Sequence, residues 1–190
     1  MRIELHCHST KSDGALAPVE LAARAASRDV QWFALTDHDT CAGTNEARPA
    51  GATVIRAVEL SCAHRGKNVH LLCYDRGGDW EALERVLTAG RVARRNRVVT
   101  MAARLAQRGL AVDIAPLLAV AETRAVGRPD LAALLVAAGH VQDKQEAFTR
   151  HLWDGGPVDV PHGHLSLIDA LTAASAAGAA VALAHPHQVQ

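Results

Sequence analysis

Two histidines near the N-terminus have the type and spacing of metal ligands. His6 and His8 lie in the stretch 3–8, where apolar and polar residues alternate, and this alternation predicts a strand. Because successive strand side chains point to opposite faces, both imidazoles lie on one side and Cys7 points the other way, into the core. Imidazole is the commonest metal ligand in proteins. An isolated pair of this kind is weak evidence, so the interpretation depends on partners elsewhere in the chain.

Further residues of ligand type stand at or near the ends of the other predicted strands. They are His38, Glu59, His70 and His185, together with Asp13 in a glycine-containing loop. Taken singly, Asp13 is typical of a turn and His70 of a hydrogen-bonded core histidine. A buried carboxylate such as Glu59, however, requires a paired cation. Since β/α enzymes place their active sites at strand ends, the combined set predicts one shared metal site.

The mixture of imidazole and carboxylate groups indicates which metals and which chemistry to expect. Such ligands suit Mn, Fe or Zn, and one carboxylate, here Glu59, can bridge two ions. Closely spaced ions clamp the attacking and leaving oxygens of a displacement at phosphorus and lower the pKa of a bound water. The residues alone therefore favour hydrolysis of a phosphate ester.

Two kinds of sequence pattern predict the elements that hold these residues. Short apolar segments predict strands at residues 32–36, 53–60, 68–74 and 180–184. Their alternation with helical segments indicates βαβ units and a parallel sheet or barrel, and the last segment predicts a buried strand. Helices are predicted at residues 18–28, 80–108, 114–122, 129–139, 144–152 and 166–177. Pro18 is expected at the first position of the first of these helices, and Ser166 is expected to cap the last. We therefore expect a partial barrel, residues 1–79 and 166–190, and an inserted helical subdomain, residues 80–165.

The overall composition excludes several classes of function. The 190 residues include 20 basic and 20 acidic side chains, for a formal net charge of +0, whereas a nucleic-acid coat or membrane-surface protein needs excess Lys and Arg. The four cysteines form no C-x-x-C pair, as a zinc ribbon or thioredoxin would. With no signal peptide and no apolar run of membrane-spanning length, we expect a cytoplasmic protein with reduced thiols. His162 and His164 form a second H-x-H without a carboxylate nearby in sequence, and we expect them at the surface.

The motifs that carry these residues occur in a recognisable order. H-C-H-S-T-K-S-D-G, A-L-T-D-H-D-T, V-E-L-S, N-V-H-L-L and A-L-A-H-P resemble those of the PHP (polymerase and histidinol phosphatase) family of metal-dependent phosphoesterases. The helical block, with A-R-R-N-R and V-G-R-P-D-L-A, resembles the subgroup of bacterial 3′,5′-nucleoside bisphosphate phosphatases and 5′→3′ exoribonucleases. The resemblance implies an α/β fold, a distorted (β/α)7 TIM-like barrel. It also implies two or three divalent metals, manganese first, with Fe, Zn or Mg as alternatives.

The resemblance implies roles for individual residues as well. The residues that match metal ligands are His6, His8, Asp13, His38, Glu59, His70 and His185. Glu59 corresponds to the bridging carboxylate, and Glu59, Asp13 and His38 are the expected catalytic residues. Substrate-binding residues are expected in the insertion at Arg95, Arg128 and Asp130, because guanidinium groups pair with phosphate oxygens. A solvated position on the long helix is an equally good interpretation of Arg95.

Two departures from the family pattern affect these expectations. The subgroup reads G-R-P-H where this chain has Gly127-Arg128-Pro129-Asp130, and the aspartate adds negative charge near an anionic substrate. Family members also end on a D-x-H motif that supplies the last two ligands, and no such motif follows His185 here. We expect a fragment of a longer protein rather than a natural short form, because an incomplete barrel has an unpaired strand edge.

The sequence leaves alternative functions open. A sugar or histidinol phosphate phosphatase is a rival enzyme, although the insertion argues against it. A catalytically impaired remnant that binds metal or nucleotide is a second alternative, supported by Asp130 and by the missing motif. A proofreading module acting with a polymerase is disfavoured, because the chain contains no polymerase segment. The expected partner is a small nucleotide or short RNA substrate, with no membrane and no polymerase.

Overall fold

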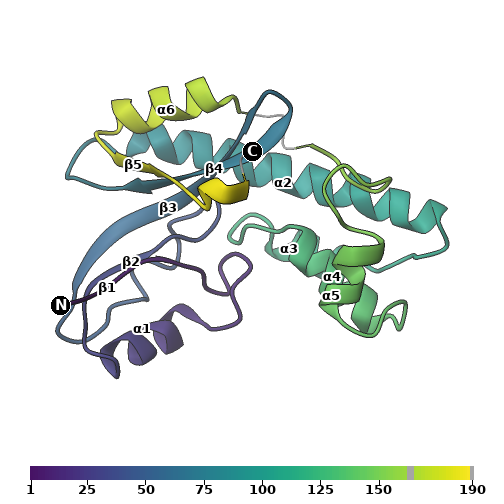
Figure 1. The fold of residues 1–190 in the computed structure, drawn as a ribbon, viewed down its shortest axis with the longest axis horizontal. Helices are drawn as coiled ribbons and strands as arrows, with labels where there is room; N and C mark the ends of the chain where they lie inside the picture. The colour runs from purple at the N-terminus through teal and green to yellow at the C-terminus, as the bar shows by residue number, and fades with distance from the viewer. Residues whose placement is uncertain (162–164, 189–190) are drawn as a thin grey trace.

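The computed structural model describes residues 1–161 and 165–188 and shows a mixed α/β fold built on one curled sheet (Figure 1). The sheet has five strands in the order β1-β2-β3-β4-β5. Their bounds are β1 Arg2–Cys7, β2 Val30–Leu35, β3 Thr53–His64, β4 Lys67–Tyr74 and β5 Ala180–Leu183. His162 and His164, which we expected at the surface, lie outside the described residues.

The sheet is only partly parallel, which corrects the expectation of a parallel barrel. β1, β2 and β3 pair in parallel, whereas β3–β4 and β4–β5 are antiparallel. Arg65 and Gly66 connect β3 to β4 with φ angles of +49° and +77°, the left-handed backbone of a two-residue hairpin turn. So short a connection cannot hold the crossover helix that a parallel pair requires. In the described residues the sheet forms a half-barrel, in which β1 and β5 do not pair with each other.

Contacts across the sheet show how strongly it curls. The hydroxyl of Tyr74, at the end of β4, donates a hydrogen bond of 3.0 Å to the carbonyl of Leu5 in β1. The rings of His6, in β1, and His185, just after β5, stack with their centroids 6.1 Å apart. The curl therefore brings residues from both edges of the sheet toward a common centre.

The last strand differs from the prediction of a buried strand. All four residues of β5 are exposed, and Val181 and Leu183 keep 38% and 42% of their surface accessible. β5 is an edge strand that pairs with β4 on one side only. Its apolar residues therefore indicate strand propensity but not burial.

The helices follow the predicted order closely. They are α1 Pro18–Ala26, α2 Glu81–Gln107, α3 Ala115–Val120, α4 Arg128–Ala137, α5 Lys144–Arg150 and α6 Leu167–Ala176, followed by a 3-10 turn at Pro186–Gln188. Pro18 occupies the first turn of α1, where its missing N–H costs no hydrogen bond. The hydroxyl of Ser166 caps α6 by accepting a 3.1 Å bond from the backbone N–H of Asp169, as the sequence predicts.

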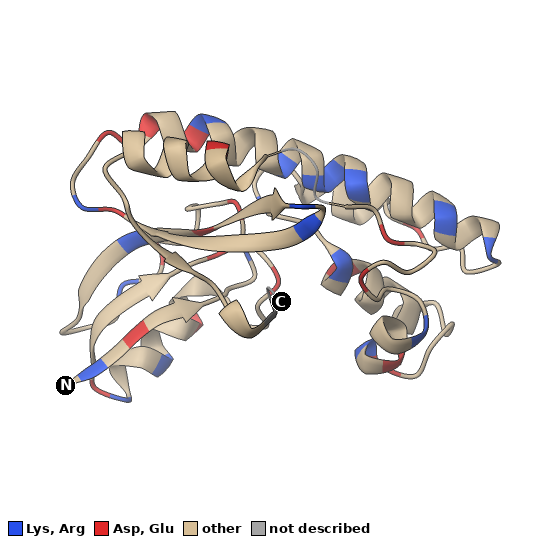
Figure 2. Cartoon of the chain, turned by 45° about the horizontal axis from the view of Figure 1, so that its top comes forward, with Lys and Arg blue, Asp and Glu red and all other residues tan. Residues whose placement is uncertain are grey.

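Helix α2 belongs to two hydrophobic cores. Its first half contributes Leu83 and Leu87 to a core with β3, β4 and α6. Its second half contributes Met101 and Leu105 to a separate core with residues 121–158. Figure 2 marks acidic positions near the start of this helix and mostly basic positions along the rest of it. The boundary predicted at residue 80 falls at the start of this helix, which packs against the sheet with its first half and against residues 121–158 with its second half.

Candidate metal centre

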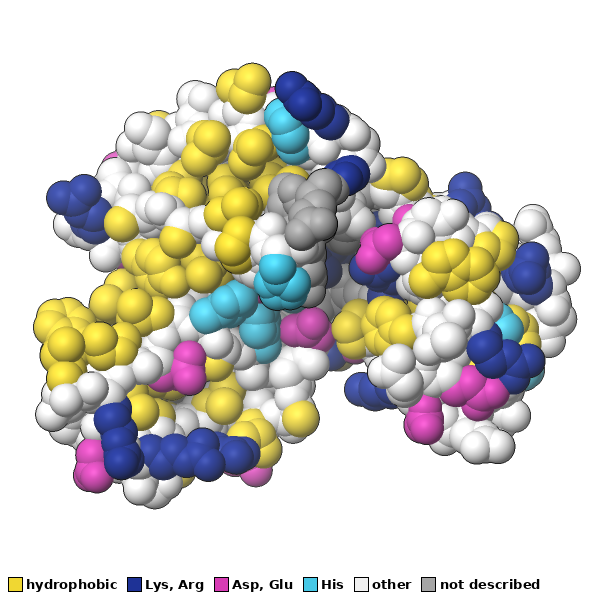
Figure 3. Space-filling view, viewed as in Figure 1, with side chains coloured by type: hydrophobic (Ala, Val, Ile, Leu, Met, Phe, Trp, Pro, Cys, Tyr) yellow, Lys and Arg dark blue, Asp and Glu magenta, His cyan; other side chains and the backbone are white. Residues whose placement is uncertain are grey.

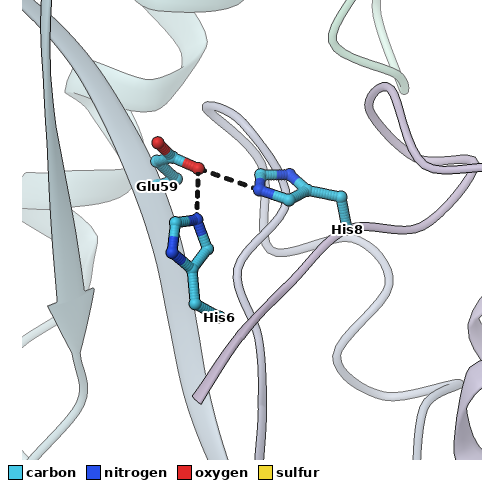
Figure 4. A group of neighbouring side chains, drawn as sticks. All are labelled: His6, His8 and Glu59. Atoms are coloured by element: carbon cyan, nitrogen blue, oxygen red, sulfur yellow. Dashed lines mark hydrogen bonds and ion pairs between the residues drawn. The ribbon is translucent and has the colours of Figure 1, made fainter. Parts of the chain in front are cut away.

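One buried carboxylate lies at the centre of the site. Glu59 is 1% exposed and comes from the middle of β3, where the strand is buried on both faces. Its Oε2 lies 2.9 Å from Nε2 of His6 and 2.9 Å from Nε2 of His8, as Figure 4 shows. Its Oε1 lies 3.0 Å from Nδ1 of His70 and 2.9 Å from Nε2 of His185. Four imidazoles thus converge on one carboxylate.

Asp13 and His38 extend this cluster toward the β1–α1 loop. Nδ1 of His8 lies 3.3 Å from Oδ1 of Asp13, and Nε2 of His38 lies 3.7 Å from its Oδ2. Three overlapping sets of ligand atoms, each within 4.8 Å, result: His6–His8–Glu59, His8–Asp13–His38 and His38–Glu59–His70. Each pair of sets shares one residue, so neighbouring ions would share ligands. The structure therefore brings all seven sequence-predicted ligands together.

The electrostatics of the cluster suit a cation. Burial raises the pKa of Glu59, but hydrogen bonds from His70 and His8 outweigh it and hold the pKa well below its usual range. Burial lowers the pKa of His38 well below its ordinary value, and the nearby charge of Arg94 lowers it further. The site therefore offers a carboxylate and a neutral imidazole at neutral pH, the protonation states that bind metals.

Two buried ring nitrogens supply an independent test of the fit. Nδ1 of His38 and Nδ1 of His185 are buried without a hydrogen-bond partner in the described part of the chain. The nearest carboxylate oxygen to the His38 nitrogen, Oε2 of Glu59, is 3.9 Å away, too far for a hydrogen bond. Since buried polar atoms are rarely left unsatisfied, the unpaired Nδ1 of His38 fits a ligand to a divalent ion. His185 presents its other ring nitrogen, Nε2, to Glu59.

Asp37, which precedes His38, has a structural role. It is buried, and its carboxylate accepts bonds of 2.7 Å from the N–H of Ser9, 2.6 Å from the hydroxyl of Ser9 and 2.6 Å from the hydroxyl of Ser12. These bonds fold the β1–α1 loop onto the end of β2. Asp37 therefore orients the loop that carries Asp13.

Asp39 connects the strand ends to helix α2. Its backbone has a φ of +49°, which directs the carboxylate toward Ser61 and Arg94. Oδ1 accepts a 2.8 Å bond from the N–H of Ser61, and Oδ2 lies 2.5 Å from Nε of Arg94. Burial raises the pKa of Asp39, but the charge of Arg94 and the hydrogen bonds from Ser61 and Arg94 together outweigh it and lower the pKa below its ordinary value. The guanidinium also donates a 2.7 Å bond to the hydroxyl of Ser61, which fixes its orientation.

A cavity of about 580 Å³ lies between the histidine cluster and the helical subdomain. Figure 3 shows the histidines gathered at the hollow between these two parts. The cavity is lined by Asp13, His38, His70 and His185 of the cluster and by three arginines, Arg94, Arg97 and Arg128. Burial lowers the pKa of Arg97 to about 10, which still leaves it charged at neutral pH. Each arginine is paired with an aspartate, Asp39, Asp159 or Asp154. The cavity therefore brings three guanidinium groups, held by these carboxylates, into the same wall as the candidate ligands.

The three residues expected to bind substrate have different positions. Arg128 lines the cavity, and its Nη1 lies 2.7 Å from Oδ1 of Asp154. Arg95 is exposed and is absent from the cavity wall. Asp130 is also absent from the wall, because its carboxylate pairs with Arg124 and with the N–H of Gly127. Sequence analysis missed Arg94 and Arg97, whose only signal was their place in an arginine-rich helix.

The fold and the site together define the class of protein: an α/β half-barrel with a histidine and carboxylate cluster of metal-ligand type at its strand ends. Comparison with known proteins then identifies the family. The sequence pattern of the PHP domain matches residues 4–116. This chain belongs to the PHP domain family.

Individual relatives cover nearly all of the chain. It is 35% identical to a 5′-3′ exoribonuclease of Haemophilus influenzae. The match covers 97% of this chain and 69% of that protein. It is also 35% identical to a 3′,5′-nucleoside bisphosphate phosphatase of Chromobacterium violaceum, over 97% of this chain and 66% of that one. A solved structure from Chromobacterium violaceum, described as an amidohydrolase with bound sulfate and no metal, superposes with a TM-score of 0.85 at 34% identity. The superposition covers 99% of this chain and 68% of that one. The chain thus spans about two thirds of the length of these relatives.

Proposed function

We propose that this protein is a metal-dependent phosphoesterase that hydrolyses a phosphate ester of a nucleotide or of an RNA end. The observation that carries the proposal is Glu59, which contacts four imidazoles. Two of these imidazoles, His70 and His185, line a cavity that is also lined by three arginines. Hydrolysis of a phosphate ester needs both a cationic centre and groups that bind phosphate oxygens. The relatives named as exoribonuclease and bisphosphate phosphatase support the substrate class.

The residues that would hold the metals are the seven convergent ligands. Three overlapping ligand sets support two or three divalent ions, and mixed imidazole and carboxylate donors suit manganese, with Fe, Zn or Mg as alternatives. When bound, such ions polarise a phosphoryl oxygen and lower the pKa of water at the site. Glu59 belongs to two of the three sets, so its carboxylate would contribute to two metal positions. Asp13 and His38 would hold an ion together with His8.

The arginines would orient the phosphate toward the ligands. Arg94 is held by Asp39 and Ser61 through Nε and Nη2, while Nη1 faces Gly127 in the cavity wall. A Cβ atom at position 127 would lie only 3.2 Å from that nitrogen. Because Asp39 fixes the guanidinium before substrate binds, little side-chain entropy is lost on binding. Arg97 and Arg128 line the same cavity, paired with Asp159 and Asp154.

The size and surroundings of the site fit a small substrate. A cavity of about 580 Å³ lies within the range that holds a nucleotide-sized ligand. No helix in the described chain is long and apolar enough to cross a membrane. All four cysteines are unpaired, which is typical of a reducing compartment and supports a cytoplasmic location.

A substrate panel tests the proposal. The purified chain, supplied with Mn²⁺, is assayed for phosphate or nucleotide release from a 3′,5′-nucleoside bisphosphate, a short 5′-phosphorylated RNA, and histidinol phosphate. We expect release from the first two, and chelation should abolish it. Turnover of histidinol phosphate alone would contradict the nucleotide assignment, and Mn²⁺-independent turnover would contradict the metal-dependent mechanism.

A further inference from the structure

The loop between β1 and α1 carries Asp13 and is tightly folded. Asp37 holds it from the side of the sheet through Ser9 and Ser12. Gly14 packs so closely that a Cβ atom there would lie 2.1 Å from the carbonyl oxygen of His8. The backbone at Asp13 can therefore shift only if the loop as a whole moves.

The helical subdomain holds the same loop from the opposite side. Nε of Arg124 donates a 2.8 Å bond to the carbonyl of Thr10, and the N–H of Ala125 donates a 2.9 Å bond to the carbonyl of Lys11. These bonds join residues more than 110 positions apart in the chain. They attach the segment before α4 to the loop that carries Asp13.

Asp130 determines where Arg124 lies. Its Oδ1 is 2.6 Å from Nη2 of Arg124, and its Oδ2 accepts a 2.7 Å bond from the N–H of Gly127. Asp130 stands in the first turn of α4, where a carboxylate is favourable. One side chain thus caps the helix and aims the guanidinium at Thr10. Such charge-assisted bonds are stronger than neutral ones.

We propose that Arg124 and Asp130 are positioning residues, through which the helical subdomain fixes Asp13 for the metal position formed by His8, Asp13 and His38. The inference rests on the proposed function, because it assigns Asp13 to a metal. In this proposal Asp130, which stands where the subgroup has histidine, acts on the β1–α1 loop and not on the substrate. Outer residues that orient metal ligands affect affinity about 10- to 100-fold when changed.

Hydrogen exchange of the metal-free full chain tests the contact itself. Asp130→Asn removes the charge but keeps an acceptor for Gly127. We expect backbone amides of residues 9–14 to exchange about tenfold faster than in wild type, as for loss of a charge-assisted bond. Amides of residues 131–135, in the subdomain core, should be unchanged. Unaltered exchange at residues 9–14 would overturn the proposal.

A matched control and a double variant separate positioning from general loss of stability. Glu146 also stands in the first turn of a subdomain helix, pairs with Arg150 and accepts a bond from the N–H of Gln142. It is not part of the contact with the loop, so Glu146→Gln should leave exchange at residues 9–14 unchanged. Because Arg124 and Asp130 act as one unit, Arg124→Gln and the double variant should match Asp130→Asn. Additive effects would contradict the shared role.

Metal binding supplies the second readout. Titration with Mn²⁺, followed by the electron paramagnetic resonance of the free ion, should show one ion bound about tenfold more weakly in Asp130→Asn. The affinity for the other ions should stay at the wild-type value. Equal weakening of all ions, or of none, would overturn the proposal. If wild type binds no Mn²⁺, the proposed function fails. The exchange comparison still decides whether Arg124 and Asp130 hold the β1–α1 loop.

Discussion

Oε1 of Glu59 lies 2.9 Å from Nε2 of His185, a residue 126 positions further along the chain. The contact joins the middle of the sheet to the turn that follows its edge strand β5. His6 reaches the other oxygen of the same carboxylate from the opposite edge. Formation of the candidate metal centre therefore depends on the curl of the whole sheet.

The pair of Asp39 and Arg94 should contribute to the acid sensitivity of the fold. Both side chains are buried, at 0% and 8% exposure. Asp39→Asn leaves a buried guanidinium without its partner and should lower the free energy of unfolding by about 3 kcal/mol. Urea unfolding followed by circular dichroism measures this. Asp75→Asn, which breaks the more exposed pair with Arg56, should cost less than about 1 kcal/mol.

The same pair predicts the direction of the pH dependence. The folded-state pKa of Asp39 is lowered. Its contribution to the free energy of unfolding is therefore complete above the unfolded-state pKa of about 3.9. The contribution is lost as the pH falls below that value and through the folded-state pKa. Stability of the wild type should therefore decline more steeply below about pH 4 than that of Asp39→Asn. Parallel acid profiles for the two proteins would rule out this role.

Two arginines of the helical region should differ in their effect on substrate binding. Arg128 lines the cavity, whereas Arg95 is exposed and outside the wall. Arg128→Ala should raise KM about tenfold or more, as expected for loss of a charge-assisted hydrogen bond. Arg95→Ala should leave KM within about twofold, typical of a surface position. Steady-state kinetics on the best nucleotide substrate measure both, and equal effects would show that the cavity is not the phosphate site.

Metal should stabilise the folded chain. An ion that binds only the folded state adds about 2.7 kcal/mol at one hundred times its Kd, and here it would also satisfy the buried Nδ1 atom of His38. Thermal unfolding should therefore shift upward with Mn²⁺ and return after chelation. His38→Ala should reduce the shift. A melting temperature that is independent of Mn²⁺ would argue against a preformed site.

The ligands could be predicted because their signals are local. A strand has a period of two, so His6 and His8 must share a face. Polar residues directly after an apolar strand, as at His38, are positioned by the end of that strand. Ser166 and Pro18 indicate helix starts by the same local chemistry. Each signal depends on only a few neighbouring residues.

The remaining features depend on long-range packing. The hydrophobic pattern of α2 does not predict which face lines the cavity, because the first and second halves of the helix pack against different cores. Sequence analysis therefore proposed Arg95, while the structure places Arg94 and Arg97 in the wall. The role of Asp130 depends on Arg124 and Thr10, which belong to different parts of the chain. The hairpin at Arg65–Gly66 was missed because strand composition does not specify direction.

Metal content of the purified chain, compared with that of Glu59→Gln, tests the central claim most directly. Elemental analysis after equilibration with Mn²⁺, with phosphate release measured on the same samples, gives both quantities. We predict two or three ions per wild-type chain with phosphate release. In the variant, which keeps its fold by circular dichroism, we predict fewer ions and at least about a 100-fold loss of turnover. Equal metal content and equal turnover in both proteins would contradict the assignment of Glu59 as the centre of the site.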